Sequence, residues 1–335
     1  MPSNAARAPR LDATDLSAIY RLVASDFQQV NALIPHHLTS EVALVEEIGE
    51  YILQSGGKRL RPLIVLLAAR CCGYGGTDHV RLAAIIEFLH TATLLHDDVV
   101  DGSLLRRGVP TANAHWDNAP SVLVGDFLYS RAFQLMVDLD RMDILTILAD
   151  ATNIIAEGEV LQLDNVGNAD LTEEAYMEVV RCKTALLFQA SAHTAGVLAT
   201  ETPSVADAMR DYGLYFGLAY QLVDDWLDYE GDSAVMGKNV GDDLAEGKAT
   251  LPLIHAMKHG ADDDAATVRR ALTSRNAREL GPVLHAVRRS GALDYTRQRA
   301  QAFAGLAVDT LAALPWNIYR EALEALAGFA VARMH

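Results

Sequence analysis

One stretch of the chain decides the fold, the segment EFLHTATLLHDDVVDGSLLRRGVPT that spans residues 87–111. In it a long apolar run leads into Asp97, Asp98 and Asp101, and the pair Arg106–Arg107 follows at once. Residues four apart lie about one turn apart on a helix, so Asp97 and Asp101 are predicted to share a face. Three carboxylates on one turn repel one another and destabilise the bare helix. The pattern therefore predicts that a cationic ligand binds there.

Carboxylate-only clusters suit Mg²⁺, which takes one or two carboxylates and completes its coordination with water and phosphate oxygens. Arg106 and Arg107 add planar forks that match the geometry of phosphate oxygens. Together the two features predict a diphosphate substrate that is bridged to the protein through Mg²⁺. A solvated acidic helix end is the alternative that this single DDxxD motif leaves open.

A second acidic cluster weakens that alternative. The segment YQLVDDWLDYEGD (220–232) repeats DDxxD at Asp224, Asp225 and Asp228, again at the end of an apolar run. The segment GKNVGDDLAEGKATLP (237–252) follows, with Lys238, Asp242, Asp243 and Lys248. Two acidic helix faces that oppose each other across one cavity would hold several metal ions between them.

Composition limits the classes of partner. The formal charge of −16 argues against nucleic acid or an anionic membrane surface. Half of the residues are apolar, so a sizeable core is available. The three cysteines, Cys71, Cys72 and Cys182, match neither a disulfide framework nor a zinc site, which favours a reducing, cytoplasmic compartment.

No membrane span is predicted, because the longest apolar run, from Leu82 to Leu95, is broken by Glu87 and His90 and is too short. Residues 1–14 lack the apolar core of a signal peptide and are expected to form a disordered tail.

The rest of the chain reads almost wholly as helix. A first helix is expected from Asp15 to about Leu33, closed by Pro35. Further helices are expected at residues 79–101, 121–138, 142–163 and 172–198. No alternating strand pattern emerges. The predicted fold class is all-α, a large helical bundle around a central cavity, with residues 15–335 as a single domain.

A second anion site is predicted at GGKRLRP (56–62), where two glycines precede Lys58 and Arg61. A turn between helices with solvated charges is the alternative. His90 lies two turns before Asp97 and could donate to a phosphate near neutral pH, or could be a hydrogen-bonded core histidine. Lys183 could bind phosphate, or could extend its ammonium group to the surface.

These motifs, in this order and spacing, resemble the full motif set of trans-isoprenyl diphosphate synthases, the polyprenyl synthetase family. The motifs are GGKRLRP, LLHDDVVD (94–101) with RRG (106–108), KT (183–184), YQLVDDWLD and GKNVGDDLAEGKATLP. The stretches SVLVGDFLYSRAFQ (121–134) and IIAEGEVLQL (154–163) resemble the long-chain members. The departures are Gly102, where an acidic residue often follows DDxxD, and Tyr220, where phenylalanine is usual.

The resemblance implies an isoprenoid-synthase-type bundle and a role for each motif residue. About three Mg²⁺ ions would be held by Asp97, Asp98, Asp101, Asp224 and Asp228. Asp225 and Lys183 join these aspartates in the expected catalytic set. The allylic diphosphate would be bound by Arg106, Lys183, Thr184, Gln221, Lys238 and Lys248. Isopentenyl diphosphate would be bound by Lys58, Arg61, His90 and Arg107. The family also implies a homodimer and a product for quinone side chains, such as those of ubiquinone.

Product length is predicted from the residues one turn before Asp97. Ala92 and Thr93 are small, so a growing tail could pass between helices along Leu89 and on to a floor at Phe133 or Met136. Ordinary packing of small residues is the alternative. The expected activity is condensation of isopentenyl diphosphate onto farnesyl diphosphate to give octaprenyl diphosphate. Other lengths, from geranylgeranyl or from hexaprenyl to decaprenyl, a terpene cyclase and a non-catalytic partner subunit are the alternatives.

Overall fold

The computed structural model describes residues 11–12, 15–230 and 240–334, and these residues are almost entirely helical. Within these ranges the only strands are β1 (Leu105–Arg106) and β2 (Val109–Pro110), which pair antiparallel as a small hairpin. The all-α prediction is therefore confirmed.

The first part of the chain forms α1 (Leu16–Leu22), α2 (Ala24–Leu38), α3 (Ala43–Gln54), α4 (Leu60–Cys71), α5 (Asp78–Val100), α6 (Ala112–Trp116), α7 (Asn118–Asp138) and α8 (Met142–Asp164). The second part forms α9 (Glu173–Val180), the π-helical turn η1 (Arg181–Ala185), α10 (Leu186–Ala199), α11 (Pro203–Glu230), α13 (Asp242–Glu246), α14 (Leu251–His259), α15 (Asp262–Ser274), α16 (Leu280–Arg289), α17 (Ala292–Thr310) and α18 (Ile318–Ala332). Two short 3₁₀ turns, η2 (Ala277–Glu279) and η3 (Leu311–Ala313), complete the elements.

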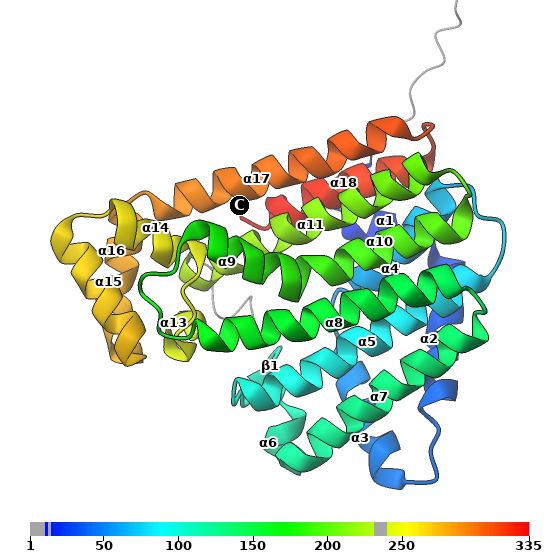
Figure 1. Ribbon diagram of the computed structural model, residues 1–335, viewed down its shortest axis with the longest axis horizontal. Helices are drawn as coiled ribbons and strands as arrows, with labels where there is room; N and C mark the ends of the chain where they lie inside the picture. The colour runs from blue at the N-terminus through cyan, green and yellow to red at the C-terminus, as the bar shows by residue number, and fades with distance from the viewer. Residues whose placement is uncertain (1–10, 13–14, 231–239, 335) are drawn as a thin grey trace, which may run out of the picture.

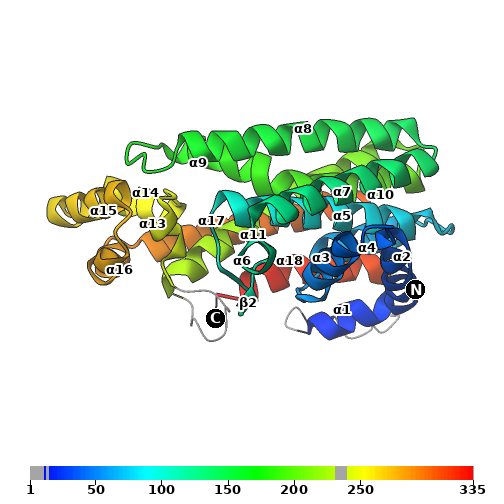
Figure 2. The ribbon, with the colours of Figure 1, turned by 90° about the horizontal axis from the view of Figure 1, so that it is seen from below.

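The long helices run roughly along the long axis of the molecule, and α13 to α16 form one end of it (Figure 1). Seen from below, α8 covers one face of the bundle and α1 lies at the opposite face (Figure 2). Between these faces α4 packs on α5 and α10, and α10 packs on α11. These four helices surround the candidate active site.

The central helix α5 is apolar around most of its circumference, as expected of a helix that is buried on all sides. Its side chains from Leu82 to Leu89 are at most 7% exposed, and they pack into one core cluster with α4, α7 and α10. Burial of this kind contributes about 1.5–3 kcal/mol for each large apolar side chain. The core therefore holds the end of α5, and with it the first DDxxD motif, in a fixed place.

The expected first helix is wrong in one respect, because it is two helices and Pro35 lies inside the second. Asp15 caps α1 by accepting from the Ala18 N–H at 3.1 Å. Pro35 stands in the last turn of α2, where it removes a single backbone hydrogen bond. Burial of Ile34 and Leu38, each 3% exposed, offsets that loss.

Across the described residues, no helix combines the length and the apolar character that spanning a bilayer requires.

Candidate active site

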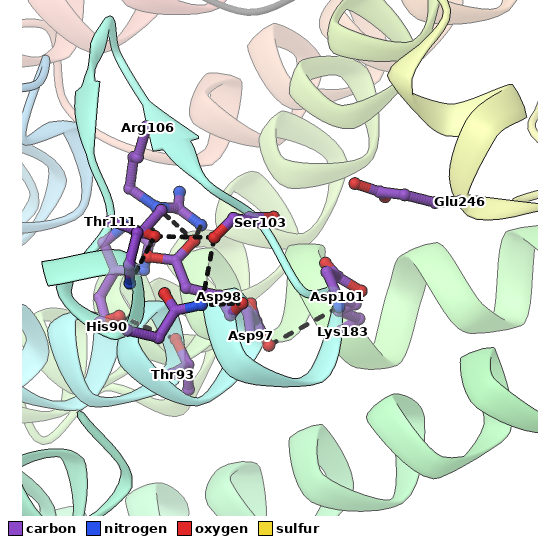
Figure 3. A network of polar contacts seen from close by, with 12 residues as sticks. His90, Thr93, Asp97, Asp98, Asp101, Ser103, Arg106, Thr111, Lys183 and Glu246 are labelled. Carbon is purple, nitrogen blue, oxygen red and sulfur yellow. Dashed lines mark hydrogen bonds and ion pairs between the residues drawn. The ribbon is translucent and has the colours of Figure 1, made fainter. Parts of the chain in front are cut away.

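The first aspartate cluster (Asp97, Asp98 and Asp101) lies at the carboxyl end of α5, where Asp101 is the C-cap. Asp98 is 1% exposed and accepts from Arg106, at 2.7 Å from Nη2 and 3.0 Å from Nε (Figure 3). Burial raises the pKa of Asp98, and the charges of Asp97 and Asp101 add to this effect, whereas the Arg106 guanidinium opposes it. The pair ties the β1–β2 hairpin to the end of α5.

Asp97 faces Lys183, which comes from the π-helical turn η1. The Lys183 Nζ lies 3.8 Å from Asp97 Oδ1 and 2.5 Å from Glu159 Oε2 on α8 (Figure 3). Gly158 makes this approach of α8 possible, because a Cβ at that position would lie 2.6 Å from the Cβ of Cys182. A π-helical turn inside a helix often marks a functional site. Here it places Lys183 beside the end of α5.

Asp101 faces Lys248, which lies in the segment after α13. The Lys248 Nζ is 2.9 Å from Asp101 Oδ2 and 2.6 Å from Glu246 Oε2. Figure 3 shows Glu246 pointing toward Asp101 from the far side of the site. A residue that follows the second DDxxD motif thus touches the first one. The two motifs therefore meet at one site, as the sequence predicted.

The second aspartate cluster (Asp224, Asp225 and Asp228) lies in the last two turns of α11. Asp224 Oδ1 is 2.7 Å from Nη2 of Arg333, at the end of α18. Asp228 is fully buried, and its Oδ2 accepts from the backbone N–H of Asp243 at 3.3 Å. The predicted ligand Lys238 lies outside the described residues.

Asp225 differs from its neighbours because protein donors bind both of its carboxylate oxygens. The Tyr176 hydroxyl donates to Oδ2, and Gln221 Nε2 donates to Oδ1 at 2.8 Å. Gln221 in turn accepts from the Thr184 hydroxyl at 2.9 Å. Burial raises the pKa of Asp225 to about 7, and the charge of Asp243 adds to this effect. The network fixes the positions of Thr184 and Gln221, two of the predicted diphosphate ligands.

A cavity of about 140 Å³, the α11 cavity, lies beside this network. Its lining includes five residues predicted for the site, Lys183, Thr184, Gln221, Asp225 and Lys248. These residues come from η1, from α11 and from the segment after α13. Tertiary packing therefore brings the motifs KT, DDWLD and GKATLP around one space.

A second cavity of about 80 Å³, the α4 cavity, lies beside α5. Its lining includes the four residues predicted for the second anion site, Lys58, Arg61, His90 and Arg107. Tyr220, one turn before Asp224 on α11, and Glu87 also line it. The structure thus gathers three cations and a histidine from three separate motifs.

Arg61 and His90 form the centre of the α4 cavity. Arg61 Nη1 lies 3.1 Å from His90 Nε2, and the guanidinium stacks 4.1 Å from the centroid of the Phe188 ring. Burial lowers the pKa of Arg61 to about 10, although Tyr220, Glu87, Asp224 and Asp97 oppose this effect. Burial and the charge of Arg61 hold the pKa of His90 well below its usual value. His90 is therefore neutral at pH 7 and accepts from Arg61.

The glycines of GGKRLRP allow the hairpin to reach this cavity. A Cβ at Gly57 would lie 2.4 Å from Nη1 of Arg107, so only glycine leaves room for that guanidinium. Arg107 and Gly108 both have positive φ, of 54° and 79°, as a type I′ hairpin turn requires. The neighbouring Arg59 is bound by Glu87, at 3.0 Å from Nε. Arg59 is therefore an ion-paired residue at the cavity's edge.

The residues predicted to set product length lie on α5 and α7, which pack against each other. Ala92, Leu89 and Met136 are at most 1% exposed, whereas Thr93 and Phe133 are half-buried. The Thr93 hydroxyl donates to the carbonyl of His90 at 2.8 Å. The role of these residues in product length stays a prediction.

The aspartates fit a metal that is bridged by substrate. Among the described residues no three His, Cys, Asp or Glu side chains converge closely enough to hold an ion alone. Mg²⁺ matches this arrangement, because it commonly takes one or two carboxylates and fills its remaining positions with water and phosphate oxygens. Asp97 and Asp101 already lie within 4 Å of cationic groups. They are therefore placed in a position that favours positive charge.

Four residues of the site were missed by sequence reasoning, Glu159, Tyr176, Glu246 and Arg333. Glu159 lies in the stretch IIAEGEVLQL, whose family resemblance was the only available signal. Tyr176 and Glu246 stand near recognised motifs but belong to no pattern of their own. Arg333 lies two residues from the end of the sequence and carries no signal at all.

The Polyprenyl synthetase family model matches residues 42–288 of this chain. The chain is 53% identical to the octaprenyl diphosphate synthase of Escherichia coli (strain K12) over 320 residues, which are 95% of this chain and 99% of that protein. It is 46% identical to the all-trans-nonaprenyl-diphosphate synthase (geranyl-diphosphate specific) of Rhodobacter capsulatus, over 93% of this chain and 96% of that one.

A solved structure is similar over nearly the whole fold. The crystal structure of a polyprenyl synthase from Caulobacter crescentus CB15, complexed with calcium and isoprenyl diphosphate, matches with a TM-score of 0.93. That chain is 46% identical, and the match covers 97% of this chain and 100% of that one. The expected isoprenoid-synthase-type fold is thereby confirmed.

Proposed function

This chain belongs to the polyprenyl synthetase family and is a prenyltransferase, and we propose that its product is all-trans octaprenyl diphosphate. In this proposal it adds isopentenyl diphosphate units in sequence to an allylic primer, farnesyl diphosphate. The 53% identity to an octaprenyl diphosphate synthase over 95% of the chain supports this product. Quinone side chains, such as those of ubiquinone, are the proposed destination.

The observation that carries the proposal is the presence of two cation-lined cavities beside one aspartate cluster. The α11 cavity contains Lys183 and Lys248, which contact Asp97 and Asp101. The α4 cavity contains Lys58, Arg61 and Arg107 and lacks a residue of that cluster in its lining. A metal-bound diphosphate fits the first cavity, and a diphosphate bound by cations alone fits the second. A chain-elongating prenyltransferase needs both.

The first cavity would stabilise the leaving group. Breaking the allylic C–O bond leaves a carbocation and a diphosphate that carries additional negative charge. Lys183, Lys248 and Arg106 would then attract the departing diphosphate more strongly than the intact ester, and this difference lowers the barrier. Thr184 and Gln221 would orient the same group by hydrogen bonds from their fixed positions.

Mg²⁺ ions, about three in number, would be held by Asp97, Asp98, Asp101, Asp224 and Asp228. When bound, such ions neutralise diphosphate charge and act as Lewis acids on its oxygens. For Asp98 and Asp224 this role requires that each share its carboxylate with the arginine it now pairs, Arg106 and Arg333.

The second cavity would hold isopentenyl diphosphate so that its double bond attacks the allylic cation. Lys58, Arg61, Arg107 and His90 would bind its phosphate oxygens. A new carbon–carbon bond forms, and loss of a proton restores a double bond in the lengthened chain. Leu94 and Phe188 line this cavity with apolar surface, which excludes the water that would otherwise react with the cation.

The growing tail is proposed to extend along α5, past Ala92, Thr93 and Leu89. Small side chains at the first two positions leave room for a prenyl tail beneath the first aspartate cluster. Phe133 and Met136 on α7 are the proposed floor.

A homodimer is proposed, with its interface on α7 and α8. Large apolar side chains on these helices are exposed to solvent, and the most exposed are Leu123 (66%), Val137 (68%), Met142 (73%) and Val160 (66%). A patch of this kind marks a contact surface. Light scattering coupled to gel filtration should give twice the chain mass, and Leu123→Arg should give a monomer. A monomeric parent protein would contradict this part of the proposal.

A cytoplasmic location is proposed, because the three cysteines are free thiols. Burial raises the pKa of Cys71 to about 11 and of Cys72 to about 12, so both stay protonated and unreactive.

The deciding experiment incubates the purified protein with farnesyl diphosphate, isopentenyl diphosphate and Mg²⁺, and identifies the product by mass spectrometry. An octaprenyl product supports the proposal in full. A product of another length contradicts the octaprenyl assignment and leaves a chain-elongating synthase. A cyclised hydrocarbon or no turnover contradicts the proposed reaction.

A further inference from the structure

The two lysines of the α11 cavity have the same arrangement of partners. Lys183 lies between Asp97 and Glu159, and Lys248 lies between Asp101 and Glu246. In each case one partner belongs to the first aspartate cluster and the other does not. In each case the glutamate is the nearer partner, at 2.5 Å and 2.6 Å, against 3.8 Å and 2.9 Å for the aspartates.

These glutamates are held in the protein rather than in solvent. The side chain of Glu159 is 24% exposed and that of Glu246 is 28% exposed, and both lysine side chains are 18% exposed. Burial raises the pKa of Glu159 to about 7, an effect that Asp97 increases and Lys183 opposes. Burial also raises the pKa of Glu246. An ion pair at such a place is screened less by solvent and salt than a surface pair.

A divalent ion and an ammonium group compete for the same carboxylate. When an ion takes Asp97 and Asp101, like charge drives Lys183 and Lys248 away from those oxygens. Without another anion nearby, the lysines would either keep the aspartates from the ion or move out of the cavity. A lysine has three N–H donors, so it can stay bound to one glutamate and still donate to a diphosphate.

We propose that Glu159 and Glu246 are positioning residues, which retain Lys183 and Lys248 in the α11 cavity while a divalent ion occupies Asp97 and Asp101. This inference rests on the proposed function and deepens it. It assigns a role to two carboxylates outside the DDxxD motifs. They act through the lysines and need not touch metal or substrate.

The first test is the Mg²⁺ concentration needed for half-saturation, measured in Glu159→Gln. The amide keeps the shape of the side chain and removes its charge. Lys183 should then pair more closely with Asp97 and compete with the ion, so half-saturation should require about tenfold more Mg²⁺. The KM for isopentenyl diphosphate should stay unchanged, because its proposed ligands line the other cavity.

A readout that does not depend on turnover is the melting temperature of the protein with inorganic diphosphate, followed as Mg²⁺ is added. Ligands that bind only the folded state raise the melting temperature by mass action. The midpoint of this rise should move to about tenfold higher Mg²⁺ in Glu159→Gln, and Glu246→Gln should act in the same direction.

A double-variant cycle separates positioning from a simple loss of negative charge. If Glu159 acts through Lys183, then Glu159→Gln should change the Mg²⁺ midpoint by less than about twofold in a Lys183→Met background. A full tenfold effect in that background would mean that the carboxylate acts on the ion directly, and it would overturn the proposal.

The matched control is Glu178→Gln. Glu178 pairs with Arg181 of the same π-helical turn at 2.6 Å, but its side chain is 49% exposed and faces away from the aspartates. Its Mg²⁺ midpoint should equal that of the parent protein. Glu159→Asp keeps the charge and should restore the midpoint to within about threefold of the parent.

The outcomes distinguish this inference from the proposed function. If the parent protein elongates farnesyl diphosphate and Glu159→Gln and Glu246→Gln show parent Mg²⁺ midpoints, the inference fails alone. A midpoint shift no larger than that of Glu178→Gln also overturns it. If the parent protein makes no elongated product, the proposed function fails. Should Glu159→Gln not fold, Glu159→Asp and Glu246→Gln still provide the measurement.

Discussion

Replacing Gly158 by alanine tests whether the contact between α8 and the π-helical turn η1 sets the activity. The change adds one methyl group at a helix position. That methyl would lie 2.6 Å from the Cβ of Cys182 and 3.0 Å from the backbone nitrogen of Lys183. Carbon atoms in van der Waals contact lie about 3.5–4.0 Å apart, so α8 and η1 must separate by about 1 Å.

Two costs follow from that separation. Overpacking of a buried contact costs about 1–3 kcal/mol, and the better helix propensity of alanine returns about 0.5–1 kcal/mol. The melting temperature should therefore fall by only about 1–3 °C in a protein of this length. The effect on activity should be larger, because a displacement of about 1 Å in a positioned group can cost about 100-fold in rate.

The assay compares kcat/KM with farnesyl diphosphate and isopentenyl diphosphate in Gly158→Ala and in a control, Gly305→Ala. Gly305 lies on the exposed side of α17, and a Cβ there would meet no atom within 4 Å. The control should keep full activity. A folded Gly158→Ala protein with kcat/KM within about twofold of the parent would refute the reasoning, because Lys183 would then tolerate a shift of about 1 Å.

Three further outcomes are expected. Arg106→Lys cannot make the paired bonds to Asp98, so kcat/KM for the allylic substrate should fall about 10–100-fold in steady-state assays, and an unchanged value would count against that pairing. His90 is held neutral in the folded state, whereas the unfolded chain takes up a proton below about pH 6.5, so the free energy of unfolding should fall as pH drops through that value. His90→Gln should flatten this pH slope in urea titrations at pH 7.5 and 5.5, and an unaltered slope would show that protonation of His90 does not cause the loss of stability. Ala92→Phe should shorten the product seen by mass spectrometry, and a product of parent length would end the argument for a tail path along α5.

Helical periodicity located most of the fold. The helices expected at residues 79–101 and 142–163 correspond to α5 (Asp78–Val100) and α8 (Met142–Asp164) within one residue at each end. Both are long segments with strong apolar patterns, for which local sequence and final burial agree. The expected helix at 172–198 is interrupted by η1, because packing of α8 against Cys182 and Lys183 imposes a turn that no local pattern marks.

Residue chemistry located most of the candidate site. Aspartates at helical spacing, an arginine pair and a glycine-rich cationic segment each predict an anion or metal site from the needs of their own charges. Those needs are local, so one sequence suffices to detect them. The gathering of Lys58, Arg61, His90 and Arg107 around one cavity follows the same prediction, since like charges converge only where an anion is to be bound.

The partner of each charge was decided only by the tertiary structure. Lys183 with Glu159, Lys248 with Asp101, and Arg333 with Asp224 join segments that are far apart in the chain. An ion pair depends on distance in space, and that distance follows from how apolar faces pack across the whole bundle. The sequence by itself determined which chemistry is present and on which helices it lies, and the packing of those helices determined which groups meet.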